Sequence, residues 1–182
     1  MLSYFSGAEE VQYLVGAQKL SSPLPLITIS MASLILPKVS SVGTYRELNY
    51  IFRKALLFLP VILIATLIAV PISPYVIEFV LGTKYSSSIN AFQFYLMGGL
   101  LSMFITPVST IIYKLNKEPF FIFLNVVQLI SNITLNYFLI PSYGATGASI
   151  ATFSAKVIGM VFILVFLIKY GILDRGRFDE EI

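Results

Sequence analysis

A lysine near the middle of the last long apolar segment is the residue best suited to binding chemistry. Lys156 would carry its ammonium at mid-depth of a membrane-length helix, where a charge costs at least about 2.5–3.5 kcal/mol unless it faces water or a partner. Thr152 and Ser149 precede it by one and two helical turns on roughly the same face. We interpret this face as a cationic site in a cavity, suited to a phosphate or another anion. The alternative is a lysine that extends to the interface or pairs structurally.

A stripe of carboxamides follows one face of the preceding apolar segment. Its members recur at intervals of three and four residues, as neighbours on a helix face do: Asn125, Gln128, Asn132 and Asn136. Within a bilayer each carboxamide needs a hydrogen-bond partner or water. Hydroxyl- and phosphate-rich ligands match amide donors and acceptors, so the stripe is a second candidate for substrate binding. Hydrogen bonding to neighbouring helices is the alternative.

Small residues repeat every fourth position on a face adjacent to Lys156. This ladder consists of Gly147, Ala151, Ala155 and Gly159. Small side chains let two membrane helices approach closely. We therefore predict a helix-packing seam beside the polar face of this segment.

A second lysine, Lys19, lies in the outer half of the first apolar segment, with Gln12 and Ser30 on its face. It can extend to the interface more easily than Lys156, but it is also a cavity candidate. No carboxylate lies at mid-depth of any predicted span, so no acidic relay for ion coupling is evident. We predict no cofactor and no metal site, and the coupling ion stays open.

Five membrane-length segments carry these residues. The chain is 57% hydrophobic and only 12% charged, far less charged than a soluble domain, and its segments lack the alternation of barrel strands. We predict an all-α integral membrane protein with one membrane domain, residues 1–182, whose spans can cross a core of roughly 30 Å. The predicted spans are 13–36, 53–77, 90–113, 119–140 and 145–168, with an interfacial amphipathic helix at about 44–52 and a C-terminal cytoplasmic tail at 171–182.

Basic residues alternate by side between these spans. One set of loops and flanks holds Lys38, Arg46, Arg53, Lys54, Lys114, Lys117, Lys169, Arg175 and Arg177, whereas the opposite set holds Lys84. The positive-inside rule assigns the basic set to the cytoplasm. We therefore predict a multi-pass protein of the cytoplasmic (plasma) membrane, with its N-terminus outside and its C-terminus inside.

The chain contains no cysteine, histidine or tryptophan. Disulfides, thiolate nucleophiles, imidazole metal sites and triads that use histidine are therefore excluded. Carboxylate chemistry is not excluded, but the acids lie mostly outside the spans. No basic stripe with aromatic platforms is present, so we expect no nucleic-acid partner.

Three segments together resemble one family of membrane proteins. The first covers residues 6–20 with 36–38 following, and the second covers residues 74–85, where an apolar helix end precedes Gly82 and Tyr85. The third is the uncharged hairpin around Ile140, Pro141 and Tyr143, with small residues after it. In order and spacing they resemble the polysaccharide-biosynthesis exporters, O-antigen-type flippases of the MOP superfamily, which are related to the MATE transporters.

The resemblance implies both a fold and a function. The five spans would correspond to spans eight to twelve, in the C-terminal lobe of a MATE-like transporter with twelve or fourteen spans. Such flippases move lipid-pyrophosphate-linked oligosaccharides between leaflets by alternating access, through a polar, cationic cavity between two lobes. The chain would be inactive alone, because such a cavity needs the missing N-terminal half or another chain. Lys156, Thr152, Lys19 and the carboxamides are compatible with that cavity.

Two other functions stay open at this point. A small membrane scaffold or subunit would have no transport activity of its own. A membrane-embedded transferase acting on polyprenyl phosphates is a less favoured alternative, since that chemistry usually requires clustered acids or histidine near the interface. We therefore predict a protein that is not an enzyme.

Overall fold

The computed structural model describes residues 1–115 and 117–169, and over these residues the chain is built from helices without strands. The elements are α1 (Leu2–Phe5), α2 (Gly7–Ser21), α3 (Pro23–Ser40), α4 (Tyr45–Leu81), the 3-10 helix η1 (Thr83–Tyr85), α5 (Ser88–Lys114) and α6 (Glu118–Lys169). By length and composition, α3, α4, α5 and residues 119–169 of α6 could each cross a membrane. The prediction of an all-α, multi-pass membrane protein is confirmed. The predicted tail at 171–182 lies outside the described residues.

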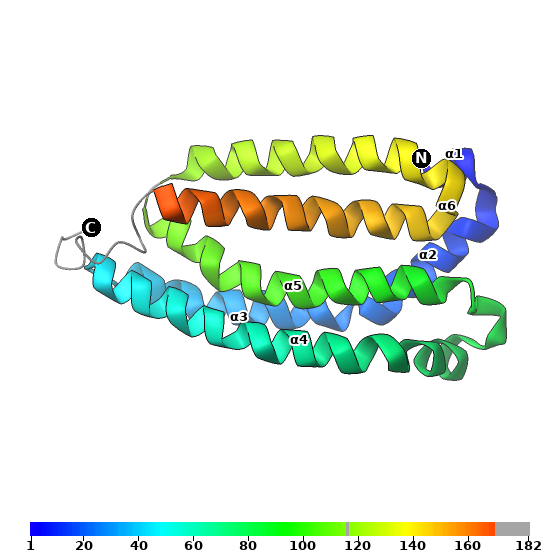
Figure 1. The fold of residues 1–182 in the computed structure, drawn as a ribbon, viewed down its shortest axis with the longest axis horizontal. Coiled ribbons are helices and arrows are strands. Elements are labelled where there is room, and N and C mark those ends of the chain that lie inside the picture. The colour runs from blue at the N-terminus through cyan, green and yellow to red at the C-terminus, as the bar shows by residue number, and fades with distance from the viewer. Residues whose placement is uncertain (116, 170–182) are drawn as a thin grey trace.

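α5 is the central helix of the bundle. It packs against α2, α3 and α4 on one side and against α6 on the other (Figure 1). The C-terminal ends of α3 and α5, which carry Lys38 and Lys114, lie at one end of the bundle (Figure 1). There the Lys114 ammonium donates a hydrogen bond to the Ser40 carbonyl (3.1 Å). We call this the basic end.

α2 and α3 divide the first predicted span, 13–36, at Ser22. Pro23 has no backbone N–H and cannot continue the hydrogen-bond ladder of α2, but proline is well accommodated at the first position of a new helix. The Lys19 carbonyl instead accepts the N–H (3.2 Å) and hydroxyl (2.7 Å) of Ser22. The chain therefore remains hydrogen-bonded where the two helices meet.

α4 joins the predicted interfacial helix (44–52) and the predicted span (53–77) into one helix of 37 residues. At 1.5 Å per residue it is roughly 55 Å long, well beyond a hydrocarbon core of about 30 Å. Glu47 accepts a hydrogen bond from the Gly43 N–H (3.0 Å), as in a capping box, but Thr44 makes no side-chain cap. Leu48 and Phe52 anchor this first part of α4, since both are buried.

α6 is a helical hairpin whose two limbs run side by side (Figure 1). Gly144 divides it, with a backbone (φ 51°, ψ −129°) outside the helical region. A side chain at Gly147 would overlap the backbone carbonyl of Leu139, so the limbs approach too closely there for any Cβ. Gly144 is the residue of α6 with a non-helical backbone, and it lies between the predicted spans 119–140 and 145–168, whose bounds stay a prediction.

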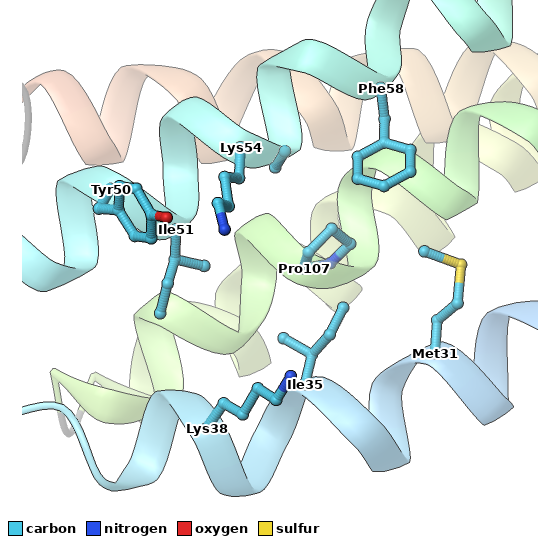
Figure 2. Close-up of a pocket in the computed structure, with 9 residues that line it drawn as sticks. Met31, Ile35, Lys38, Tyr50, Ile51, Lys54, Phe58 and Pro107 are labelled. Atoms are coloured by element: carbon cyan, nitrogen blue, oxygen red, sulfur yellow. The ribbon is translucent and has the colours of Figure 1, made fainter.

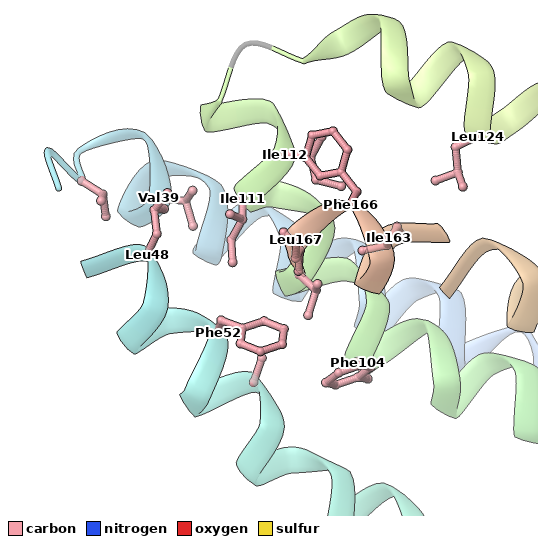
Figure 3. Close-up of a cluster of buried hydrophobic side chains, with 13 residues drawn as sticks. Val39, Leu48, Phe52, Phe104, Ile111, Ile112, Leu124, Ile163, Phe166 and Leu167 are labelled. Carbon is pink, nitrogen blue, oxygen red and sulfur yellow. The ribbon is translucent and has the colours of Figure 1, made fainter. Parts of the chain in front are cut away.

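Two apolar clusters hold the bundle, one toward each end. The cluster at the basic end joins Leu48 and Phe52 of α4, Phe104 of α5, and Ile163 and Leu167 of α6 (Figure 3). The other cluster joins α2, α4, α5 and both limbs of α6 through Ala17, Ile77, Ala91, Phe92, Ile140, Ala145 and Ala148. Between these clusters, polar groups occupy the middle of α5 and the middle of each limb of α6.

A proline-freed carbonyl between α4 and α5 is satisfied by a side chain. Pro74 cannot donate to Val70, one turn earlier, so the Val70 carbonyl would be orphaned in lipid. That carbonyl accepts the Gln93 side-chain amide of α5 (3.2 Å) and the Ser73 hydroxyl (2.7 Å). Gln93 also donates to the Ser73 hydroxyl (2.9 Å). The Gln93 side chain thus links α5 to α4 beside Pro74.

Candidate functional site

The Lys156 ammonium crosses from α6 to α5 and is held there by two acceptors. It donates to the Gly98 carbonyl (3.0 Å) and to the Ser102 hydroxyl (3.0 Å). Both acceptors are neutral, and among the described residues no carboxylate lies within ion-pair distance of Lys156. An ammonium has three donors, so its positive charge is uncompensated and one donor stays available.

Gly98 makes room for the lysine to lie against α5. A Cβ at Gly98 would sit 3.5 Å from Lys156 Cδ and 3.7 Å from Phe153, so the aliphatic stem of the lysine covers the glycine. Phe153 in turn contacts Phe94 of α5, with ring centres 6.0 Å apart. Apolar contacts therefore fix the stem, and the polar end reaches the backbone of α5.

Thr152, one turn before Lys156, connects the two limbs of α6. The Asn132 amide approaches the Thr152 hydroxyl at 3.5 Å, the limit of a hydrogen bond. The Asn136 side-chain amide donates to the side-chain carbonyl oxygen (Oδ1) of Asn132 at 2.9 Å. The Asn136 side-chain carbonyl oxygen is buried and has no hydrogen-bond partner among the described residues. This network retains an unused acceptor inside the hairpin.

Gln128 and Asn125, the other two carboxamides, lie in different surroundings. Gln128 is half-buried and packs over Gly159, where a Cβ would overlap its amide. Asn125 is exposed. The stripe is therefore divided between hairpin packing at Gln128, a polar network at Asn132 and Asn136, and an outward-facing Asn125.

The small-residue ladder faces the interior of the bundle. Gly147, Ala151, Ala155 and Gly159 are all buried. The two glycines meet the other limb of α6, at Leu139 and at Gln128. The ladder therefore supports the closure of the hairpin at two points along its length.

Lys19 is exposed on α2, and no contact joins it to Lys156 in the described part of the chain. Its neighbour Gln18 instead donates to the Tyr95 hydroxyl of α5 (2.8 Å). Tyr95 lies on the same face of α5 as Gly98 and Ser102, one turn earlier. Sequence reasoning missed Gln18, Tyr95, Gly98 and Ser102, although the adjacency of Gln18 to Lys19 was a usable signal.

We use the name polar cluster for three hydrogen-bonded sets of residues on α2, α5 and α6. It consists of Gln18, Tyr95, Ser102, Asn132, Asn136, Thr152 and Lys156. Ser102, Thr152 and Lys156 lie between the two apolar clusters, whereas Tyr95 packs against the cluster that contains Ala17 and Phe92. The polar cluster carries one uncompensated cation. Its chemistry suits an anion that also carries hydroxyl groups.

Metal ligands are absent from this region. Of the side chains described by the structure, no three His, Cys, Asp or Glu residues lie close enough together to hold a metal ion. The prediction that the protein uses no cofactor is not tested by this observation and stays a prediction.

Comparison with known proteins finds a similarity to a transporter. Over 173 residues, 92% of this chain, the sequence is 25% identical to a curated protein of Shigella flexneri named "Putative O-antigen transporter". The chain spans 40% of the length of that protein. No family model matches the chain, and no solved structure matches it. The resemblance found in the sequence motifs is thus supported by a curated relative, and the MATE-like lobe stays a prediction.

Proposed function

We propose that this chain forms part of a flippase that moves lipid-pyrophosphate-linked oligosaccharides across the plasma membrane. The proposal includes alternating access, an N-terminus outside, and a C-terminus in the cytoplasm. It also includes inactivity of the chain alone, since a cavity between two lobes needs a second lobe. The relative from Shigella flexneri named "Putative O-antigen transporter" supports the class of cargo.

The observation that carries the proposal is the uncompensated ammonium of Lys156 at the middle of the bundle. Its two acceptors are a carbonyl and a hydroxyl, neither of which neutralises its charge. A pyrophosphate would supply both the missing charge and an acceptor for the remaining donor. The cluster's hydroxyl and amide groups, at Thr152, Asn132 and Asn136, would bind the sugar hydroxyls.

Binding to the isolated chain tests the head-group site. Undecaprenyl diphosphate should bind the purified chain in nanodiscs, and Lys156→Met should weaken binding about 10- to 100-fold, because a charged hydrogen bond contributes about 1.5–3 kcal/mol. Methionine keeps an unbranched apolar stem over Gly98, which favours a folded variant. Lys84→Met, at an exposed lysine in the loop before α5, is the matched control. Equal binding of undecaprenyl diphosphate by wild type and Lys156→Met would contradict a head-group site at Lys156.

Transport is tested in the source organism, where the chain has its natural partners. Lys156→Met in the chromosomal gene should reduce surface polysaccharide and accumulate lipid-linked precursor, while the membrane level of the protein stays constant. Normal export would contradict the proposal. Flipping by the reconstituted chain alone would contradict the claim that it is inactive by itself, and turnover of a polyprenyl phosphate would favour a transferase.

A further inference from the structure

A groove near the basic end lies on the opposite side of α5 from Lys156. α3 and α4 form its walls and Pro107 of α5 forms its floor, enclosing about 360 Å³ (Figure 2). This volume falls within the range of roughly 300–1,000 Å³ that small-molecule pockets occupy. At about 3.6 residues per turn, Pro107 faces away from Gly98 and Ser102. The groove is therefore separate from the polar cluster.

Two lysines lie on opposite walls of this groove. Lys38 lies on α3 and Lys54 on α4, and both line the groove. The Lys54 ammonium points from α4 into the space between the helices, and the Lys38 side chain lies along α3 with its ammonium beside Ile35 (Figure 2). Lys54 lies 4.5 Å from the centre of the Tyr50 ring. Among the side chains that the structure describes, neither lysine has a carboxylate partner, and no acid lines the groove. An anion would complement this unneutralised pair.

The rest of the lining is apolar. Ile35, Phe58 and Pro107 are among the apolar residues that line the groove. A soluble anion would leave this surface unused, whereas a lipid would place its phosphate at the lysines and a chain against the apolar wall. Charge at one end and hydrocarbon along the wall is the pattern of a phospholipid.

We propose that this groove binds one anionic glycerophospholipid of the surrounding bilayer, with its phosphate between Lys38 and Lys54 and an acyl chain along Ile35, Phe58 and Pro107. Basic pockets between membrane helices at the cytoplasmic side bind anionic head groups in this way. The site does not depend on transport. It is a resident-lipid site on the outer side of the α3–α4–α5 layer.

Native mass spectrometry of the purified chain tests the site. After release from nanodiscs that contain both phosphatidylglycerol and phosphatidylcholine, the chain should retain phosphatidylglycerol preferentially. The double variant Lys38→Gln/Lys54→Gln should lower that retention by about fivefold for each lysine removed. Lys38→Arg/Lys54→Arg should preserve it, and Lys19→Gln/Lys84→Gln, two exposed lysines outside the groove, is the matched control.

The lipid chain is tested separately from the charge. Ile35→Trp should narrow the groove along its apolar wall and reduce phosphatidylglycerol retention while both lysines remain.

Three results would overturn the proposal, and a fourth keeps it separate from the flippase. Equal retention of the two lipids, or retention unchanged in Lys38→Gln/Lys54→Gln, would overturn it. Displacement of the lipid by inorganic phosphate at equal concentration would assign the groove to a soluble anion instead and would also overturn it. Lys156→Met should leave the retention unchanged, so this test and the test of the flippase can fail independently.

Discussion

Glu10 and Ala145, separated by most of the chain, are joined by a hydrogen bond of 2.6 Å from the Ala145 backbone N–H to the carboxylate of Glu10. Ala145 is the first residue after the Gly144 turn, so its N–H belongs to the unsatisfied first turn of the second limb of α6. A carboxylate there satisfies a donor and complements the positive end of the helix dipole. The Ser6 hydroxyl also donates to the Ile140 carbonyl (3.3 Å), on the other side of the turn. The chain's first polar segment thus fastens the hairpin.

Removing the Glu10 carboxylate should destabilise the bundle. Glu10→Ala loses the cap and the charge at the helix N-terminus, which together contribute about 1–2 kcal/mol. We expect a lower midpoint of thermal unfolding in detergent, followed by circular dichroism, with a smaller decrease for Glu10→Gln. Glu9→Ala, at the exposed neighbour, is the control and should leave the midpoint unchanged. A decrease of equal size in both alanine variants would refute a specific cap.

Gly144→Ala should destabilise the hairpin for two reasons. A left-handed φ of 51° is unfavourable for alanine, and a Cβ at this position would overlap the Glu10 carboxylate. Strain of this kind costs about 1–3 kcal/mol, which the same unfolding measurement resolves. Gly43→Ala is the matched control, because nothing lies within 4 Å of a Cβ there. Unchanged stability of Gly144→Ala would show that the turn can adopt another backbone conformation.

The sequence was sufficient to predict features that depend on local chemistry. The uncharged stretch around Pro141 and Gly144 predicts a hairpin because a chain must reverse where an apolar run ends and another begins. The place of Lys156 in an apolar run predicts a cation at mid-depth of the membrane, and this position stays a prediction. The sequence did not predict that the interfacial helix (44–52) and the following span (53–77) form one continuous helix, α4. Nothing in the residues at 52–53 distinguishes a bend from a continuous helix.

The partners of Lys156 could not be predicted, because they depend on which face of α5 meets α6. A membrane helix is apolar on most sides, so its pattern does not indicate the face that packs inward. Gly98, Ser102 and Tyr95 look like ordinary residues of an apolar span until α6 is placed beside them. The carboxamide stripe has the same ambiguity. Its periodicity predicts that the carboxamides share a helix face, but it does not predict that Gln128 packs on Gly159 while Asn132 approaches Thr152.

Gln93→Leu should loosen the contact between α4 and α5. It removes the donor that satisfies the Val70 carbonyl, and hydrogen bonds between membrane helices contribute about 1 kcal/mol. The matching change Pro74→Ala restores a backbone N–H that can reach Val70 within α4. Gln93→Leu should therefore cost less in the Pro74→Ala background than in the wild type. Equal costs in the two backgrounds, measured by unfolding in detergent, would disprove the assignment of Gln93 to the proline kink.

Gly159 and Gln128 should show coupled effects on stability, because their contact closes the α6 hairpin far from its turn. Gly159→Ala places a methyl group where the Gln128 amide lies, so the amide or the limb must move. Gln128→Ala opens that space, and the double variant should be less destabilised than the sum of the two single variants. Residues in direct contact typically couple by about 0.5–3 kcal/mol, whereas distant sites add independently. The control pairs Gly159→Ala with Asn125→Ala. Asn125 lies on the same limb of α6 as Gln128 but is exposed, so the two substitutions should have additive effects. Additivity in both pairs would mean that Gln128 does not pack on Gly159 in the membrane.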